Sequence, residues 1–349
     1  MSYTNGLDDP TQLFNTILWT GDGNSSRSIT GVGFAPDMVW WKGRTTTFDH
    51  RLIDTLRSGT YPKLLYPNLT IAESEDVNNA ESIDSDGFTI GSGNAVNQSG
   101  QTYVAWNWKA GGTGSSNTDG SITSTVSANT TAGFSIVSYT GTGSAGTVGH
   151  GLSSAPSIII IKVLTNTAND WVVYHQATGN NQSTFLNANN AVFSNAFINN
   201  TTPTSSVFSV DGSNYSSGSS RNYIAYCFTE KKGYSKFGSY TGNGTNNNGT
   251  FFYCGFSPSV VIIKASSSSR NWVILDNKRL GYNDKNYRLF PNLTNAEDTT
   301  SGIIDFTANG FKLMSNNNTV NESGVTYIVM AFAESPFVNS NGAVPTNAR

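Results

Sequence analysis

The chain has 349 residues, a net charge of −3 and a charged fraction of 12%, about half the charged fraction of a typical soluble domain. This balance excludes electrostatic attraction to nucleic acid or to an anionic membrane, and no apolar run approaches the length of a membrane-spanning helix. Aromatic residues make up 12% of the chain, too many for disorder, and the abundant Gly, Ser, Thr and Asn indicate short strands joined by polar turns.

The chain begins with MSYTNGLDDP, which lacks the apolar core of a secretory signal. A standard signal peptide carries about 7–15 apolar residues after a basic start. We therefore expect synthesis in a cytoplasm, without export by the general route and without membrane insertion.

The same short motifs then occur three times along the chain. Each set starts with a turn: WTGDG, YTGTG or YTGNG. An apolar segment that ends in lysine follows, as GFAPDMVWWK, GLSSAPSIIIIK or GFSPSVVIIK. Each set closes with an aromatic strand: TYVAWNW, NYIAYCF or TYIVMAF. Motifs in a fixed order and spacing indicate three copies of one structural repeat.

These repeats predict an all-β fold of three tandem antiparallel β-sandwich modules, each of about 100 residues. Short apolar runs alternate with Gly/Asn/Ser clusters, and no stretch keeps a helical period. The predicted modules are residues 1–112, 133–233 and 234–349, with a Gly/Ser/Thr-rich linker at 113–132.

The adjacent tryptophans Trp40 and Trp41 are predicted to pack in a core. In the other two repeats, isoleucines replace both of them: Ile160 and Ile161, then Ile262 and Ile263. Isoleucine cannot stack on a sugar as tryptophan does, whereas either residue can fill a core. The strand is apolar on both faces, which is typical of a central strand covered on both sides.

The final strand of each repeat is predicted to present large apolar residues to a core on one face. The other face carries a tyrosine in every repeat: Tyr103, Tyr223 and Tyr327. A tyrosine at all three positions predicts a buried ring whose hydroxyl is hydrogen-bonded.

Three further residues are the candidates for a binding surface. Trp171 and Trp272 follow the lysine-ending strand by nine and eight residues, and His50 has this place in the first repeat. Packing is the favoured interpretation, but tryptophans near a sheet edge would also suit a partly exposed binding surface for a glycan.

The sequence contains no motif for catalysis, a cofactor or a metal ion. The three histidines have no metal-ligand spacing, and the Gly-rich turns lead into strands instead of helices. Asp54 with Arg57 and Asp276 with Arg279 repeat an Asp-x-x-Arg spacing that favours a structural ion pair, and His175 replaces the aspartate in the second repeat. We expect no enzymatic activity, no cofactor and no metal. Cys227 and Cys254 are expected to be buried free thiols, with a disulfide as the alternative.

The combined motifs resemble a known class of proteins. DDP near the start, the T-G-x-G and G-F-x-P-x-x-V-x-x-K elements, SDGFTIGSGNAVNQSGQTYVAWNWKAGG, SITSTVSANTTAGFSIVSYTG and AFAESPFVNSNGAVPTNAR are similar to structural proteins of marine bacteriophages, including phages of cyanobacteria. The resemblance covers essentially the whole chain and implies a virion or tail-fibre protein. More distantly, the motif order resembles small H-type lectin sandwiches, with a jelly roll as the alternative. These lectins form trimers, so the three modules could form a pseudo-threefold assembly within one chain.

Resemblance and composition together predict a non-enzymatic virion protein on the particle surface, most simply a tail-fibre or adsorption component. The alternatives are a head decoration protein and a lectin-like module that binds a host glycan. A secreted bacterial adhesin is disfavoured because no signal peptide is expected. Expected partners are other virion proteins, further copies of the chain and a host-cell glycan.

Overall fold

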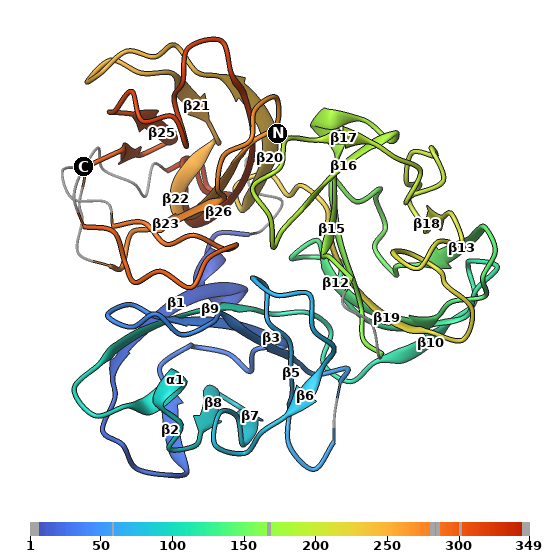
Figure 1. Cartoon of the computed structure of the whole chain (residues 1–349). Coiled ribbons are helices and arrows are strands. Elements are labelled where there is room, and N and C mark those ends of the chain that lie inside the picture. The colour runs from blue at the N-terminus through green and yellow to red at the C-terminus, as the bar shows by residue number, and fades with distance from the viewer. Residues whose placement is uncertain are drawn as a thin grey trace.

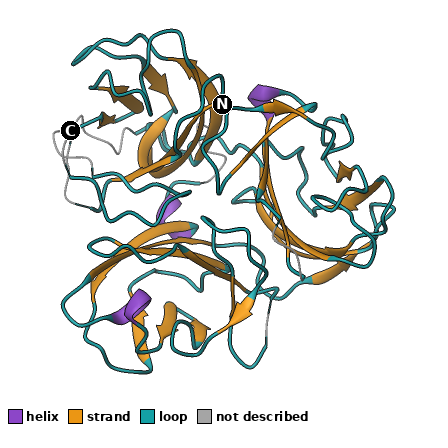
Figure 2. Cartoon of the chain, viewed as in Figure 1, coloured by secondary structure: helices purple, strands orange, loops and turns teal. Residues whose placement is uncertain are grey.

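The computed structural model describes residues 7–57, 59–165, 169–279, 283, 287–299 and 302–343. Within these residues the regular secondary structure is almost entirely β-strand, and the strands of its sheets pair antiparallel (Figure 2). The helical segments of this part are single turns: η1 (Pro10–Gln12), α1 (Asn94–Asn97) and η2 (Gln176–Thr178). The predicted all-β fold is confirmed.

One four-strand order occurs three times, and we call these strand sets the inner sheets. In each set the first strand of a repeat pairs with the last, the last pairs with the lysine-containing strand, and that strand pairs with the one after it. The first inner sheet is β1 (Phe14–Thr20), β9 (Thr102–Trp108), β3 (Met38–Gly43) and β4 (Arg51–Asp54). The second is β12 (Phe134–Thr140), β19 (Asn222–Phe228), β14 (Ile158–Val163) and β15 (Val172–His175). The third is β20 (Ser235–Thr241), β26 (Thr326–Pro336), β22 (Phe256–Ala265) and β23 (Val273–Asp276).

A smaller outer sheet covers each inner sheet. The outer sheets are β2 (Arg27–Thr30), β8 (Gly87–Ile90) and β7 (Ser82–Asp84); β13 (Gly146–Gly149) and β18 (Val207–Val210); and β21 (Phe251–Tyr253), β25 (Gly310–Leu313) and β24 (Ile304–Thr307). The remaining strands are β5 (Lys63–Leu64), β6 (Ser74–Glu75), β10 (Ser115–Asn117), β11 (Ser124–Asn129), β16 (Gln182–Phe185) and β17 (Phe193–Ser194). We call residues 14–108, 115–228 and 235–336 units 1, 2 and 3.

Each unit has its own apolar core between its two sheets, and the recurring tyrosine lies in it. Tyr103, Tyr223 and Tyr327 are fully buried, and each stacks on an aromatic ring of the first inner strand at 5.1–5.2 Å between centroids. Each hydroxyl donates to a backbone carbonyl and accepts from a backbone N–H. The predicted tyrosine role is therefore confirmed in all three repeats.

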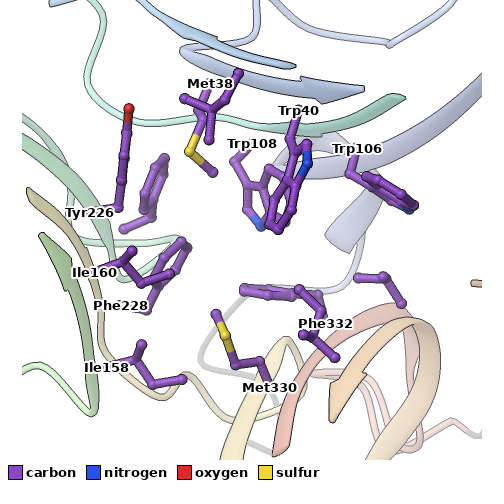
Figure 3. Packing of buried hydrophobic residues seen from close by; sticks show 14 of the residues in the cluster. Met38, Trp40, Trp106, Trp108, Ile158, Ile160, Tyr226, Phe228, Met330 and Phe332 are labelled. Atoms are coloured by element: carbon purple, nitrogen blue, oxygen red, sulfur yellow. The ribbon is translucent and has the colours of Figure 1, made fainter. Parts of the chain in front are cut away.

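The other face of every inner sheet contributes to one apolar cluster at the centre of the molecule. Alternation along β3 sends Trp41 into the core of unit 1 and Trp40 into this central cluster, so both tryptophans pack as predicted. The last strands contribute their large apolar face: Trp106 and Trp108, Tyr226 and Phe228, and Met330 and Phe332. Figure 3 shows these side chains converging from the three inner sheets. The central cluster explains why the inner strands are apolar on both faces.

The three units surround the central cluster in an approximately threefold arrangement (Figure 1). The two ends of the described chain lie next to each other where unit 3 adjoins unit 1. There Ser340 N donates to Asp8 Oδ1 at 2.7 Å. The ring is therefore closed by non-covalent contacts.

The segment 113–132, expected to be a linker, contains two strands of a sheet. β10 pairs with β11, and β11 pairs with β12, so both extend the second inner sheet. Ile122 and Val126 enter the core of unit 2. These two apolar side chains are enough to hold a Ser/Thr-rich segment on the sheet, because hydroxyl side chains suit the solvent face of a strand.

We expect the chain to unfold in one cooperative transition, because separating any unit would expose its share of the central cluster to water. Each large side chain in the cluster stabilises the fold by about 1.5–3 kcal/mol. Differential scanning calorimetry should give calorimetric and van't Hoff enthalpies that agree. A calorimetric enthalpy about three times the van't Hoff value would show independent units and contradict the shared core.

Candidate functional site

The candidate binding-surface residues Trp171, Trp272 and His50 lie inside the molecule. Their exposed fractions are 0%, 2% and 0%. Each immediately precedes the fourth strand of an inner sheet, and both tryptophans belong to the central cluster. The structure thus corrects the predicted surface, because these positions face a neighbouring unit instead of solvent. Packing, the favoured interpretation, is confirmed.

Each of these three rings bonds to a backbone carbonyl of the neighbouring unit. Unit 2 contacts unit 1, unit 3 contacts unit 2, and unit 1 contacts unit 3, so the contacts form a closed cycle. The pairs are Trp171 Nε1 with Tyr66 O (3.1 Å), Trp272 Nε1 with Phe185 O (2.9 Å) and His50 Nε2 with Phe290 O (3.0 Å). Trp40 Nε1 donates to His50 Nδ1 at 3.0 Å, so the proton of a neutral His50 lies on Nε2 and is donated to Phe290.

Two residues after each carbonyl acceptor, an asparagine side chain fixes the backbone of the segment that carries the ring residue. Its side-chain oxygen accepts the backbone N–H of the ring residue, and its amide donates to the residue before that ring. The three are Asn68, Asn187 and Asn292, with acceptor distances of 2.9, 2.9 and 3.0 Å to His50 N, Trp171 N and Trp272 N. The sequence PNLT occurs at 67–70 and again at 291–294. This repeated motif around Asn68 and Asn292 is a sequence signal for the unit interfaces that was not predicted from the repeats.

The last residue of the fourth inner strand forms a second cycle of contacts. Asp54 Oδ2 accepts from the Tyr226 hydroxyl of unit 2 at 2.6 Å, and Asp276 Oδ2 accepts from Trp106 Nε1 of unit 1 at 3.0 Å. At the third interface the corresponding residue of unit 3 is Met330, which has no donor. There His175 replaces the aspartate, and its Nε2 lies 3.2 Å from Val329 O. Its Nδ1 accepts from Ala177 N, so Nε2 is the donor in the neutral ring.

The repeated Asp-x-x-Arg spacing forms buried ion pairs. Arg57 Nε lies 2.7 Å from Asp54, and Arg279 Nε lies 2.7 Å from Asp276. Arg279 also binds Glu297 at 2.9 Å, and Arg44 of unit 1 binds the same carboxylate at 2.9 Å. The Glu297 carboxylate therefore links units 3 and 1. The carboxylate oxygens of Asp54, Asp276 and Glu297 all accept from structural partners.

The lysine that ends each repeated apolar segment is completely buried. Lys162 Nζ donates to Thr70 O of unit 1 at 2.7 Å and Lys264 Nζ donates to Asn189 O of unit 2 at 3.4 Å, whereas Lys42 Nζ donates to carbonyls of its own unit. Burial lowers the pKa of Lys42 and Lys162 to about 8 and that of Lys264 to about 7. A buried ammonium with carbonyl acceptors ties loops together but has no access to a substrate.

Cys227 and Cys254 are free thiols, buried in the cores of units 2 and 3. Burial raises the pKa of both thiols, which disfavours the reactive thiolate. The expected free thiols are confirmed.

An open cleft of about 550 Å³ lies on unit 1 beside Asp37 and Asp54. Asp37 accepts from Ala110 N at 2.7 Å and from Thr55 Oγ1 at 3.1 Å, and burial raises its pKa. Serines occupy the corresponding positions in the other units, Ser157 and Ser259. Asp37 therefore anchors the chain where it leaves β9 toward unit 2. This carboxylate contact is specific to unit 1.

A smaller groove of about 230 Å³ lies between unit 3 and the connection that leads into it from unit 2, and Tyr253 lines it. Across the part of the chain that the structure describes, no group of three or more His, Cys, Asp or Glu side chains is arranged to hold a metal ion. No helix in that part is long and apolar enough to cross a membrane.

Tyr226→Phe should lower the free energy of unfolding by about 1–3 kcal/mol, because it removes a donor from the buried Asp54 carboxylate. Tyr234→Phe is the matched control: its ring is equally buried, and its hydroxyl has no hydrogen-bond partner among the described residues. Chemical denaturation should find the control neutral or slightly stabilised. Equal losses in both variants would contradict the role of the Tyr226–Asp54 contact.

Acidification from pH 7 to pH 5 should destabilise the fold. Burial lowers the pKa of His175 to about 4 and that of His50 well below its usual value. The unfolded chain therefore binds protons below about pH 6.5 that the folded chain does not, and His175 alone lowers the free energy of unfolding by about 2 kcal/mol at pH 5. His175→Gln cannot titrate and should show a shallower loss in denaturation experiments across this pH range. An identical pH slope in wild type and variant would overturn this assignment.

Comparison with known proteins gives a family but no characterised relative. No curated protein and no solved structure matches the chain. A family model described as a domain of unknown function, DUF7483, matches residues 9–336 and so spans all three units. Because this match covers most of the chain, the protein belongs to the DUF7483 family.

Proposed function

We propose that this protein is a non-enzymatic structural component of a bacteriophage virion, displayed on the particle surface as a tail-fibre or adsorption component. The observation that supports a structural role is the closed ring of three sandwiches around one apolar cluster. In this ring the repeated polar residues hold the units together.

The use of the ionisable groups supports a role without catalysis. Asp54, Arg57 and Asp276 are buried in ion pairs and in contacts between units. His50 and His175 donate to carbonyls of neighbouring units. A general acid or base must reach a substrate, and these groups face the protein interior.

The architecture and surface also suit an exposed particle protein. Regular antiparallel sheets and a shared core leave little backbone free to open locally, which limits proteolysis. A charged fraction of 12% gives a nearly neutral exterior rich in hydroxyl and amide groups.

The approximately threefold arrangement suggests how the protein attaches to the particle. Three similar faces around one axis complement a partner that is itself threefold symmetric. Other virion proteins and further copies of this chain are the partners that belong to this proposal.

Gold-labelled antibody against the protein, viewed by electron microscopy on intact phage particles, tests the proposal. Label at the tail is the expected result. Label spread over the head would replace adsorption by head decoration, and absence of the protein from purified particles by mass spectrometry would overturn the virion assignment. Particles that contain the protein but bind no label until they are disrupted would overturn surface display.

A further inference from the structure

Two aromatic side chains on β21 are exposed on the outer face of unit 3. The exposed fraction is 44% for Phe251 and 58% for Tyr253, while Phe252 between them is buried in the core. β21 is the edge strand of its sheet, so one side of this pair is open to solvent. Folding alone does not require exposed aromatic rings at these positions.

The other two units carry small residues at the corresponding positions. β2, β13 and β21 align through the buried pairs Ile29–Phe88, Val148–Phe208 and Phe252–Phe311. In this register Phe251 corresponds to Ser28 and Thr147, and Tyr253 corresponds to Thr30 and Gly149. The corresponding strand therefore forms twice in this chain without aromatic residues at these positions. Strand formation does not explain the presence of Phe251 and Tyr253 on unit 3.

Tyr253 also lines the groove of about 230 Å³ between unit 3 and the connection that leads into it from unit 2. A Cβ added at Gly255 would lie 3.6 Å from the Tyr253 hydroxyl, so the ring extends over this glycine. Phe337 lines the groove as well. The volume is below the range of about 300–1,000 Å³ that drug-sized ligands occupy, and it suits a single ring.

A fixed pair of charged side chains lines the same groove. Lys236 Nζ donates to Glu230 Oε1 at 2.7 Å, and Phe237 N donates to Glu230 Oε2 at 3.3 Å. The side chains of Lys236 and Glu230 are each 35% exposed, so they retain contact with solvent. The groove therefore combines an aromatic surface with a held donor and a held acceptor.

We propose that the surface of Phe251, Tyr253 and the Glu230–Lys236 pair is a saccharide-binding site. A pyranose ring has a face of C–H groups that packs on the negative face of an aromatic ring. Its hydroxyls can donate hydrogen bonds to the Glu230 carboxylate and accept them from the Lys236 ammonium. A protein partner would need about 800 Å² of complementary surface, much more than this small groove offers. This inference refines the proposed role in attachment. The saccharide-binding test gives a result whether or not the protein is a virion component.

The test compares the wild-type chain with Phe251→Thr/Tyr253→Thr on a printed array of bacterial lipopolysaccharide O-chains and capsular polysaccharides. The double variant gives β21 hydroxyl residues like those of β2, and its melting temperature verifies folding. Ile71→Thr is the control, because Ile71 is also 44% exposed but lies on unit 1. We expect the wild type and the control to bind at least one saccharide, and the double variant to bind it about tenfold or more weakly.

A second variant guards against an effect of the strand substitutions alone. Glu230→Gln keeps the side-chain shape and should weaken the same binding without changing the fold. Wild-type protein that binds no saccharide on the array, or that binds as well as both variants, would overturn the proposal. Binding to periodate-treated host envelopes that the double variant loses would assign this surface to a protein partner and also overturn it. Gold labelling of the particle is unaffected by either result, so failure of this site and failure of the virion proposal are distinguishable.

Discussion

The structure depends on one constraint: each inner sheet is apolar on both faces, and both must be buried. The outer sheet of the same unit covers one face, and the second face packs in the central cluster. The three inner sheets solve this problem together, because their second faces meet in the central cluster. The ring of units is thus a consequence of burial and does not rest on a few specific bonds.

Polar contacts then select the arrangement of the units within that apolar assembly. Asp54 and Asp276 each accept from an aromatic donor of a neighbouring unit, whereas His175 faces a unit that offers only a carbonyl. The change from aspartate to histidine thus accompanies the change from Tyr226 or Trp106 to Met330. Buried donors and acceptors are costly when unpaired, so a mismatched order of units would be disfavoured.

The interior is nearly the same in all three units, and the surfaces differ. The stacked tyrosines, the ring residues that bind the next unit and the asparagines beside them occur three times. The exposed aromatic side chains of β21 occur in one unit. Features kept in every unit serve assembly, whereas features of one unit are the candidates for recognition of a partner or ligand.

The sequence by itself determined the β-class, the threefold repetition and the alternation of buried residues. These properties depend on local composition and on period-two patterns, so the packing of Trp40 and Trp41 and the bonded tyrosine hydroxyls could be predicted from the repeats. Only the tertiary structure decided that one apolar face belongs to a core shared by three units, because alternation gives the face but not what covers it. The same ambiguity made Trp171, Trp272 and His50 candidates for a surface and hid the role of PNLT. It also hid Phe251 and Tyr253, since whether FFY exposes one ring, two or none depends on the sheet behind the strand.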